Sequence, residues 1–225
     1  MKLPRALHRW DVTATRAVEI QRRLAPRVIV QRLRRRVRRV VGVDLAFLDD
    51  GKRCVAGAVL WDVDQGRVVE EQTAVQPVRF PYVPGLLSFR EAPAVLAVLR
   101  KLRGEPDVIM LDGQGLAHPR RFGLACHVGL LSDRPAIGCA KSRLVGTHRE
   151  PKSERGSRTA LVDRHERIGA VLRTRDRINP IYVSVGHRMD LPGAIDLALA
   201  CGDGYRIPAP TRLADRLVAR FKRPP

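Results

Sequence analysis

Two aspartates occupy positions where an ionised carboxylate is costly. Asp44 lies inside the apolar run 41–47, and Asp112 follows the apolar run 108–111. A turn or capping role would explain either residue alone. If the two runs are neighbouring strands of one sheet, however, the carboxylates face each other and need a cation between them. Hard oxygen ligands of this kind suit Mg²⁺ or Mn²⁺, which fill their other positions with water and substrate phosphate.

Glu91 is the third acidic candidate. The segment Ser88-x-x-Glu91 stands before an apolar stretch with helical spacing, and this pattern is a capping box. Helix capping alone would explain the glutamate. The alternative is that Glu91 joins Asp44 and Asp112 in one acidic cluster, and the choice depends on the elements that carry the three residues.

Those elements follow from the periodicity of the apolar residues. Three β-branched runs joined by tight turns predict an antiparallel meander, at 40–47, 54–63 and 67–78. Helical spacing begins at Ser88 and ends at Gly104 and Pro106, before the buried strand 108–111. This order, with acids on the first strand, the first helix and the fourth strand, resembles the ribonuclease H-like nucleases. The resemblance favours a catalytic role for the three acids.

The second half of the chain predicts a βαβ crossover and further strands. The crossover consists of the strand 108–111, a helix near 122–131 and a strand at 136–140. The other predicted elements are a surface loop at 150–159, a strand pair at 170–174 and 181–185, and a closing helix at 191–201. We therefore predict an α/β fold: a ribonuclease H-like mixed sheet, an antiparallel meander followed by parallel strands, flanked by helices.

The composition is that of a folded domain with an unusually basic surface. The chain of 225 residues is 44% hydrophobic, which excludes a disordered protein and fits a single domain spanning 1–225. The formal charge of +19 favours a nucleic-acid partner, because phosphate binding releases counterions; an arginine-rich proteome is the alternative. The arginine-dense stretch 31–40 is equally consistent with a phosphate-contacting face and with a solvated one.

The cysteines and the apolar runs bear on the compartment. Cys54, Cys126, Cys139 and Cys201 show no zinc-ligand spacing and are interpreted as reduced core thiols. The start of the chain has no apolar run of signal-peptide type, and no run reaches the roughly 18 apolar residues of a spanning helix. We therefore expect a cytoplasmic protein that does not contact a membrane.

Motifs running in order through residues 40–212 resemble the endonuclease V family. They are Val43-Asp44, the segment from Pro81 to Glu91 (PYVPGLLSFRE), Leu111-Asp112-Gly113-Gln114-Gly115 with His118-Pro119-Arg120-Arg121, the segment from Gly138 to Leu144 (GCAKSRL), and Gly186-His187-Arg188. The second segment is long and unusual, so the match is specific. On this basis 1–39 is a basic helical N-terminal segment and 40–212 is the catalytic core.

The resemblance implies a role for each matching polar residue. Asp44 and Asp112 would hold a catalytic Mg²⁺, for which Mn²⁺ can substitute, and Glu91 would complete the cluster directly or through water. Lys141 would stabilise charge on the phosphate, and His187 would act near the nucleophile or the metal's outer shell. The alternatives for the last two are a solvated lysine and a buried structural histidine. One departure is Gln114, where many members carry histidine, which puts a second-metal or proton-shuttling part in doubt.

The resemblance also implies a site for a damaged base. Pro81, Tyr82, Val83 and Pro84 would form a wedge that enters the duplex, because prolines stiffen the loop and tyrosine can replace lost base stacking. An ordinary stiff surface loop is the alternative. A flipped hypoxanthine would then lie in a pocket lined at Gly85, Leu87, Gly113, Gly115 and Leu144. A backbone N–H directed at its carbonyl would favour it over adenine.

The function implied is that of a deoxyinosine 3′ endonuclease that starts DNA repair. It would hydrolyse the second phosphodiester 3′ to the lesion and leave a 3′-hydroxyl and a 5′-phosphate. DNA containing deoxyinosine is the expected partner, with inosine RNA as a second candidate, and the enzyme is expected to be monomeric. The alternatives are a ribonuclease H-like nuclease acting on inosine RNA or branched DNA, and a non-catalytic nucleic-acid-binding protein.

Overall fold

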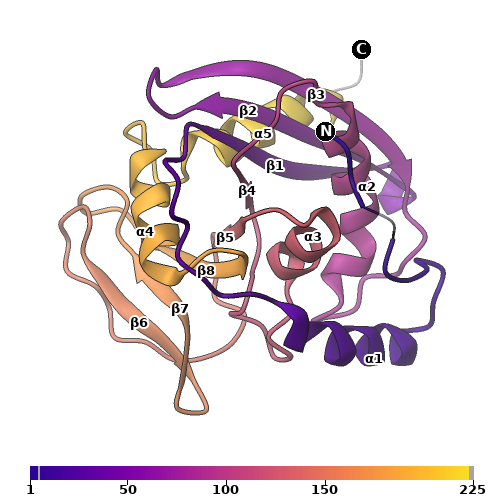
Figure 1. Cartoon of the computed structure of the whole chain (residues 1–225), viewed down its shortest axis with the longest axis horizontal. Helices are drawn as coiled ribbons and strands as arrows, with labels where there is room; N and C mark the ends of the chain where they lie inside the picture. The colour runs from indigo at the N-terminus through magenta and orange to yellow at the C-terminus, as the bar shows by residue number, and fades with distance from the viewer. Residues whose placement is uncertain (5, 223–225) are drawn as a thin grey trace.

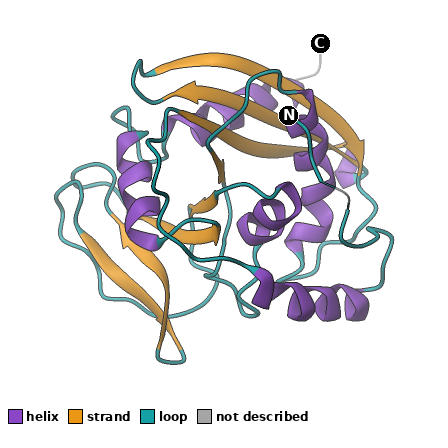
Figure 2. Ribbon diagram, in the orientation of Figure 1, coloured by secondary structure: helices purple, strands orange, loops and turns teal. Residues whose placement is uncertain are grey.

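The computed structural model describes residues 1–4 and 6–222 and contains one eight-stranded mixed sheet (Figures 1 and 2). The spatial order is β3-β2-β1-β4-β5-β8-β7-β6. The strands are β1 (Arg39–Leu48), β2 (Arg53–Asp62), β3 (Arg67–Pro77), β4 (Val108–Leu111), β5 (Ala136–Ala140), β6 (Arg158–Asp163), β7 (Glu166–Leu172) and β8 (Ile181–His187).

The predicted meander and crossover are both present. Strands β1, β2 and β3 pair antiparallel, and β4 pairs parallel with β1 on one side and with β5 on the other. Strands β8, β7 and β6 then continue the sheet antiparallel. The predicted fold class, a ribonuclease H-like mixed sheet flanked by helices, is therefore confirmed.

Helices cover both faces of the sheet (Figure 1). One face packs against α2 (Leu87–Lys101) and α3 (Leu124–Ser132), whose apolar side chains share a core with Val41, Val43 and Leu111. The other face packs against α4 (Leu191–Ala200), which covers β7 and β8, and α5 (Ala209–Ala219), which covers β1 and β2. The sheet thus forms the middle of three layers, and helices on either face can contact residues near the strand ends.

Close packing of α5 on β1 depends on a glycine. A Cβ at Gly42 would lie 2.0 Å from the carbonyl carbon of Pro210, so only glycine allows the helix to approach the strand at this point. Farther along, Ala46 of β1 packs with Val218 of α5. The helix therefore runs beside β1 from Gly42 to Ala46, which includes the position of Asp44.

Two predictions about elements need correction, and one helix was not predicted. The expected surface loop 150–159 ends in strand β6, which pairs with β7 and occupies the edge of the sheet. Helix α5 was not predicted at all. The basic segment 1–39 is helical at α1 (Ala14–Leu24) and in the short turn η1 (Ala25–Arg27), but the arginine-dense part is extended, because Val30 forms a bridge with Met189 instead of continuing the helix.

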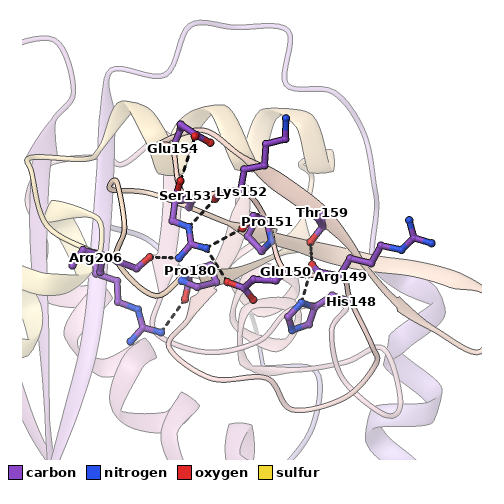
Figure 3. A network of polar contacts seen from close by, with 12 residues as sticks. His148, Arg149, Glu150, Pro151, Lys152, Ser153, Glu154, Thr159, Pro180 and Arg206 are labelled. Atoms are coloured by element: carbon purple, nitrogen blue, oxygen red, sulfur yellow. Dashed lines mark hydrogen bonds and ion pairs between the residues drawn. The ribbon is translucent and has the colours of Figure 1, made fainter.

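The loop between β5 and β6 is held in place by the buried side chain of Arg173. Arg173 donates from Nε to the Lys152 carbonyl and from Nη2 to Glu150 and to the Pro151 carbonyl. In Figure 3 the side chains of Arg149 and Lys152 point away from these contacts. The loop that follows Lys141 in the chain therefore carries basic groups on a fixed backbone.

Two further expectations concern the thiols and the membrane. All four cysteines are buried and free, as predicted. Within residues 1–4 and 6–222, no helix is both long enough and apolar enough to cross a membrane.

Candidate active site

Asp44 and Asp112 lie side by side where the parallel pairing of β1 with β4 ends, Asp44 within β1 and Asp112 directly after β4. Val43 of β1 pairs with Leu111 of β4, so the two aspartates follow the paired residues side by side. The Asp112 N–H also donates to the Val43 carbonyl at 3.5 Å. The predicted juxtaposition of the two carboxylates is therefore present, and it arises because a parallel crossover brings like ends of strands together.

The environment of Asp44 disfavours its ionised form. Burial raises the pKa of Asp44 to about 7, and the charge of Asp112 adds to the effect. The Leu45 N–H, which donates to Oδ1 at 2.8 Å, opposes it only in part. A carboxylate held this way gains free energy from any cation that arrives, because the cation offsets both causes.

Glu91 belongs to the same group and does not cap its helix. The residue at the helix N-terminus is Leu86, which makes no side-chain cap, and the Ser88 hydroxyl is engaged with His127 instead of the helix backbone. Glu91 is 8% exposed. Burial raises its pKa to about 8, and the charges of Asp44 and Asp112 contribute. The capping box is therefore not formed, and the glutamate faces the two aspartates from α2.

Lys141 provides the cation that the structure does contain. Its Nζ lies 2.5 Å from a carboxylate oxygen of Asp112, just beyond the end of β5. Burial acts to lower the pKa of Lys141, but the hydrogen bond to Asp112 outweighs it and raises the pKa. The lysine is therefore charged, and its ammonium contacts the acidic cluster although part of the side chain is exposed to solvent.

Asp215 is a fourth acid that the sequence reasoning missed. It lies on α5, and its charge raises the pKa of Asp44 and of Lys141. The placement follows from packing: Gly57, the partner of Asp44 across β1 and β2, faces the Ala214 carbonyl, from which a Cβ would lie 3.2 Å. The missed signal was apolar spacing at 213, 214, 217 and 218 after Pro210, which is typical of an amphipathic helix.

His187 lies at the opposite end of the sheet. It pairs with Ala136, the first residue of β5, whereas Lys141 follows the last residue of that strand. His187 Nδ1 accepts a hydrogen bond from the Ile29 N–H at 3.2 Å, and Nε2 lies 3.8 Å from Asp133. Since β8 runs antiparallel to β5, its carboxyl end points away from the acids. The prediction that placed His187 near the nucleophile or the metal is therefore wrong.

The carboxylate oxygens suit a hard divalent cation, although these oxygen atoms are not arranged around a common point. Within 1–4 and 6–222, no group of three or more His, Cys, Asp or Glu side chains has the arrangement of a metal site. The carboxylates repel one another, and the Lys141 ammonium takes up one oxygen of Asp112. Carboxylates with raised pKa values beside a single ammonium nevertheless form the oxygen-only ligand set that Mg²⁺ and Mn²⁺ prefer.

A cavity of about 410 Å³ adjoins the acids, and we call it the site pocket. Its wall includes Asp112 and Lys141, and its rim includes Tyr82, which is 71% exposed. The pocket is lined by most of the residues predicted to bind the substrate, three from the wedge and four from the base pocket: Tyr82, Val83, Pro84, Gly85, Leu87, Gly113 and Leu144. A hollow of this size next to charged groups is typical of a small-ligand site.

Two of the predicted substrate-binding residues, one from the base pocket and one from the wedge, are not part of the pocket wall. Gly115 packs against β8, since a Cβ there would come 2.0 Å from the Val185 carbonyl oxygen, so the prediction that it lines the pocket is wrong. Pro81 precedes the lining segment and is not part of the wall. Glycine at 115 therefore serves close backbone packing and does not serve close approach to a ligand.

Five further polar residues line the site pocket, and the sequence reasoning had not placed them there. They are Ser88, Gln114, His118, Ser142 and Arg143. Gln114 donates from Nε2 to the Ser142 carbonyl at 2.9 Å, which fixes its amide, and His118 Nε2 lies 2.9 Å from the Gly85 carbonyl oxygen. Burial lowers the pKa of His118 to about 4, so it is a neutral donor to that carbonyl. These contacts hold the two sides of the pocket rigidly.

The ribonuclease H-like sheet gathers acids from β1, from α2, from the position after β4 and from α5, and this arrangement defines a nuclease of that structural class. The family model for endonuclease V matches residues 22–216. The chain therefore belongs to the endonuclease V family, and it is a nuclease.

Individual relatives agree with this assignment. Endonuclease V of Methanothrix thermoacetophila is 54% identical over 210 residues, which cover 93% of this chain and 92% of the relative. The crystal structure of the Streptomyces avermitilis protein has a TM-score of 0.90 at 45% identity and covers 95% of this chain and 94% of its own. That of the Ciona intestinalis protein, in complex with DNA containing an inosine followed by a ribo-adenosine, has a TM-score of 0.81 at 25% identity and covers 92% and 97%.

Proposed function

We propose that this chain is a Mg²⁺-dependent endonuclease that recognises hypoxanthine in nucleic acid. It hydrolyses the second phosphodiester bond 3′ to the lesion and leaves a 3′-hydroxyl and a 5′-phosphate, which starts DNA repair. The observation that carries the proposal is the cluster of Asp44, Glu91 and Asp112 beside the site pocket, with Lys141 paired to Asp112 and the charge of Arg90 acting on Glu91. Buried negative charges without enough cationic partners lower the stability of the fold, and a bound cation would offset that cost.

The carboxylates are the proposed ligands of the cation. Asp44 and Asp112 hold it, and Glu91 completes the set directly or through water; Asp215 stands close enough to act on Asp44 from the other face. When bound, the ion polarises the scissile phosphate and lowers the pKa of the attacking water. Mn²⁺ can substitute, because it accepts the same oxygen ligands. The proposed catalytic core extends past residue 212 for this reason, since Asp215 belongs to it.

Lys141 is proposed to serve the phosphate. Its ammonium lies 2.5 Å from a carboxylate oxygen of Asp112, and the side chain is partly exposed. From this position Lys141 can reach a phosphodiester bound beside Asp112. There the ammonium stabilises the negative charge that develops on the non-bridging oxygens as the water attacks.

The site pocket is proposed to receive the flipped base. Tyr82 stands exposed at its rim, between Pro81 and Pro84, where it can replace the stacking that the base leaves behind. Gly85 and Gly113 in the wall give the base access to backbone groups. The Ciona relative, which binds inosine-containing DNA, supports this reading of the pocket. The exposed basic loop with Arg149 and Lys152 would add phosphate contacts that carry no sequence information.

Cleavage of one inosine oligonucleotide and its adenosine control tests the proposal. In Mg²⁺ we expect a single nick at the second phosphodiester 3′ to inosine and none in the control. Chelation of the metal should stop the reaction, and Mn²⁺ should restore it. Metal-independent cleavage, or equal cleavage of the two strands, would contradict the proposal. Absence of any cleavage with intact binding would favour a non-catalytic nucleic-acid-binding protein.

Inosine-containing RNA is the second candidate substrate. The ribo-adenosine that follows inosine in the Ciona complex shows that this relative binds a ribonucleotide beside the lesion. Matched inosine DNA, inosine RNA and branched DNA compared under one set of conditions separate the candidates. The remaining proposals are a single domain over 1–225, a monomeric state and a cytoplasmic location.

A further inference from the structure

A hydrogen-bonded row of three side chains links the N-terminal segment to the site pocket. His8 Nε2 lies 2.7 Å from His127 Nε2, and His127 Nδ1 lies 2.9 Å from Ser88 Oγ. At the outer end, His8 Nδ1 lies 2.7 Å from the carbonyl oxygen of Arg9. Ser88 lines the site pocket, whereas His8 precedes residue 22, where the family match begins.

The direction of every hydrogen bond in this row is determined by its outer end. The Arg9 carbonyl can only accept, so the hydrogen of a neutral His8 is on Nδ1 and its Nε2 carries a lone pair. His127 must then donate from Nε2 to His8, which leaves His127 Nδ1 as an acceptor. The Ser88 hydroxyl therefore donates to His127, and its proton is already in use.

Both histidines are held neutral and in place. Burial lowers the pKa of His127 well below its usual value, and burial is also the main cause that lowers the pKa of His8. The His8 ring packs 4.6 Å from Trp10 and 5.5 Å from Phe89, centroid to centroid. Aromatic packing thus fixes the N-terminal segment on α2 and α3 and keeps the row intact.

We propose that this row makes Ser88 a hydrogen-bond acceptor that reads the N1–H of hypoxanthine in the site pocket. The inference rests on the proposed function. With its proton committed to His127, the Ser88 oxygen offers only lone pairs to the pocket. Hypoxanthine joined to a sugar has one N–H, at N1, whereas adenine has no hydrogen at that atom, so Ser88 favours the deaminated base. His127 and His8 are positioning residues that act through Ser88.

The Ser88→Ala variant tests this role by its affinity for two bases, hypoxanthine and purine, of which only hypoxanthine carries the N1–H. Affinity is measured without divalent metal for oligonucleotides that carry hypoxanthine, unsubstituted purine or adenine. Purine fits the same space but has no N1–H and no carbonyl. We expect Ser88→Ala to weaken hypoxanthine binding by about 5- to 30-fold and to leave purine binding within about twofold. Equal loss for both bases, or no loss, overturns the proposal.

Two further variants separate this role from a structural one. Ser132→Ala removes another buried hydroxyl, which donates to the Val128 carbonyl away from the site pocket, and should leave base preference unchanged. His8→Phe keeps an aromatic ring against Trp10 and Phe89 but removes the acceptor for His127. It should reduce the preference for hypoxanthine over purine by about 2- to 5-fold, without a loss of purine binding. A wild type that does not prefer hypoxanthine to adenine would instead sink the proposed function.

Discussion

The two ends of the sheet carry the same kinds of side chain but balance their charges differently. At one end, burial and the charges of neighbouring carboxylates raise the pKa values of Asp44 and Glu91, and Lys141 is the ion-pair partner of Asp112. At the other end, acids are matched with arginines: Asp133 with Arg188 at 2.7 Å, Glu105 with Arg134 at 2.6 Å, and Asp107 with Arg35 at 3.2 Å.

The difference shows which polar cluster is built for structure and which for a ligand. Ion pairs at the surface hold loops together and need nothing more. A buried group of carboxylates with too few partners costs stability, so the fold has to be stable enough elsewhere to tolerate it. His187 lies at the balanced end, the end of the sheet where the acids are paired with arginines. The residue type alone therefore did not predict its position.

Removing one metal-binding carboxylate should have the largest effect. Asp112→Asn is expected to lower the rate of inosine-strand cleavage in Mg²⁺ by about a thousandfold or more, because an amide is a far weaker ligand than a carboxylate. Binding of the uncleaved strand should persist. Asp133→Asn, at the balanced end, is the matched control and should cleave normally. Near-normal cleavage by Asp112→Asn would remove the metal role from this end of the sheet.

Asp215→Asn should have the next largest effect. Asp215 acts on Asp44 from α5, so loss of its charge weakens the cluster without removing either strand carboxylate. We expect single-turnover cleavage in Mg²⁺ to fall by about 10- to 100-fold, and the Mg²⁺ concentration for half-maximal rate to rise. Asp203→Asn, which removes an acid paired with Arg212, is the control. An unchanged metal requirement would exclude Asp215 from the site.

Tyr82→Ala should impair engagement of the lesion more than the chemistry. The exposed ring at the rim of the site pocket is expected to contribute stacking that is worth about a 5- to 30-fold gain in affinity for an inosine strand. Kd and single-turnover rate at saturating enzyme separate the two effects. Tyr205→Ala removes another exposed tyrosine, outside the pocket wall, and should change neither. Unchanged affinity of Tyr82→Ala would leave the wedge without support.

Asp44→Asn should stabilise the metal-free protein while removing activity. The folded-state pKa of Asp44 is about 7, above its usual value, so the folded state holds a proton that the unfolded chain has released. Stability from this group is therefore present at low pH and is lost as pH rises from about 4 through 7. At pH 9 the variant should be more stable than wild type by about 1 to 2 kcal/mol in chemical denaturation without metal, and the two should nearly coincide at pH 4. A variant less stable than wild type at pH 9 would contradict this sign.

His187→Gln should have the smallest effect on cleavage. Its side chain is 1% exposed and accepts from the Ile29 N–H, so the variant should lose about 1 to 2 kcal/mol of stability. The rate of cleavage by the folded fraction should stay within about twofold of wild type, as measured at a temperature well below the melting transition. A loss of a hundredfold would return His187 to the site.

Sequence reasoning found the elements whose pattern is local. The β-branched runs gave β1, β2, β3 and the exact span of β5, and they made β1 and β4 plausible neighbours, which the parallel pairing confirms. Sequence reasoning missed β6, which lies on a polar edge of the sheet, and α5, which follows a proline-containing stretch. Missing α5 meant missing Asp215.

Side-chain direction was the part that sequence could not supply. Asp44 and Asp112 were found because an acid within an apolar strand is conspicuous, and because parallel strands bring like ends together. Gly115 and His187 were misplaced, since nothing local tells which backbone a glycine approaches or that β8 runs antiparallel to β5. The row from His8 to Ser88 joins residues that are 119 and 39 positions apart, so it depends wholly on tertiary packing.

Calorimetric titration of Mn²⁺ into metal-free protein tests the central claim most directly, because it reports the site without catalysis. The account predicts binding by wild type that is lost in Asp44→Asn/Asp112→Asn and kept in Glu105→Gln/Asp133→Asn, the variant at the balanced end. Binding that survives the first double substitution, or that is lost only in the second, would show that the acidic cluster of Asp44 and Asp112 does not hold the cation.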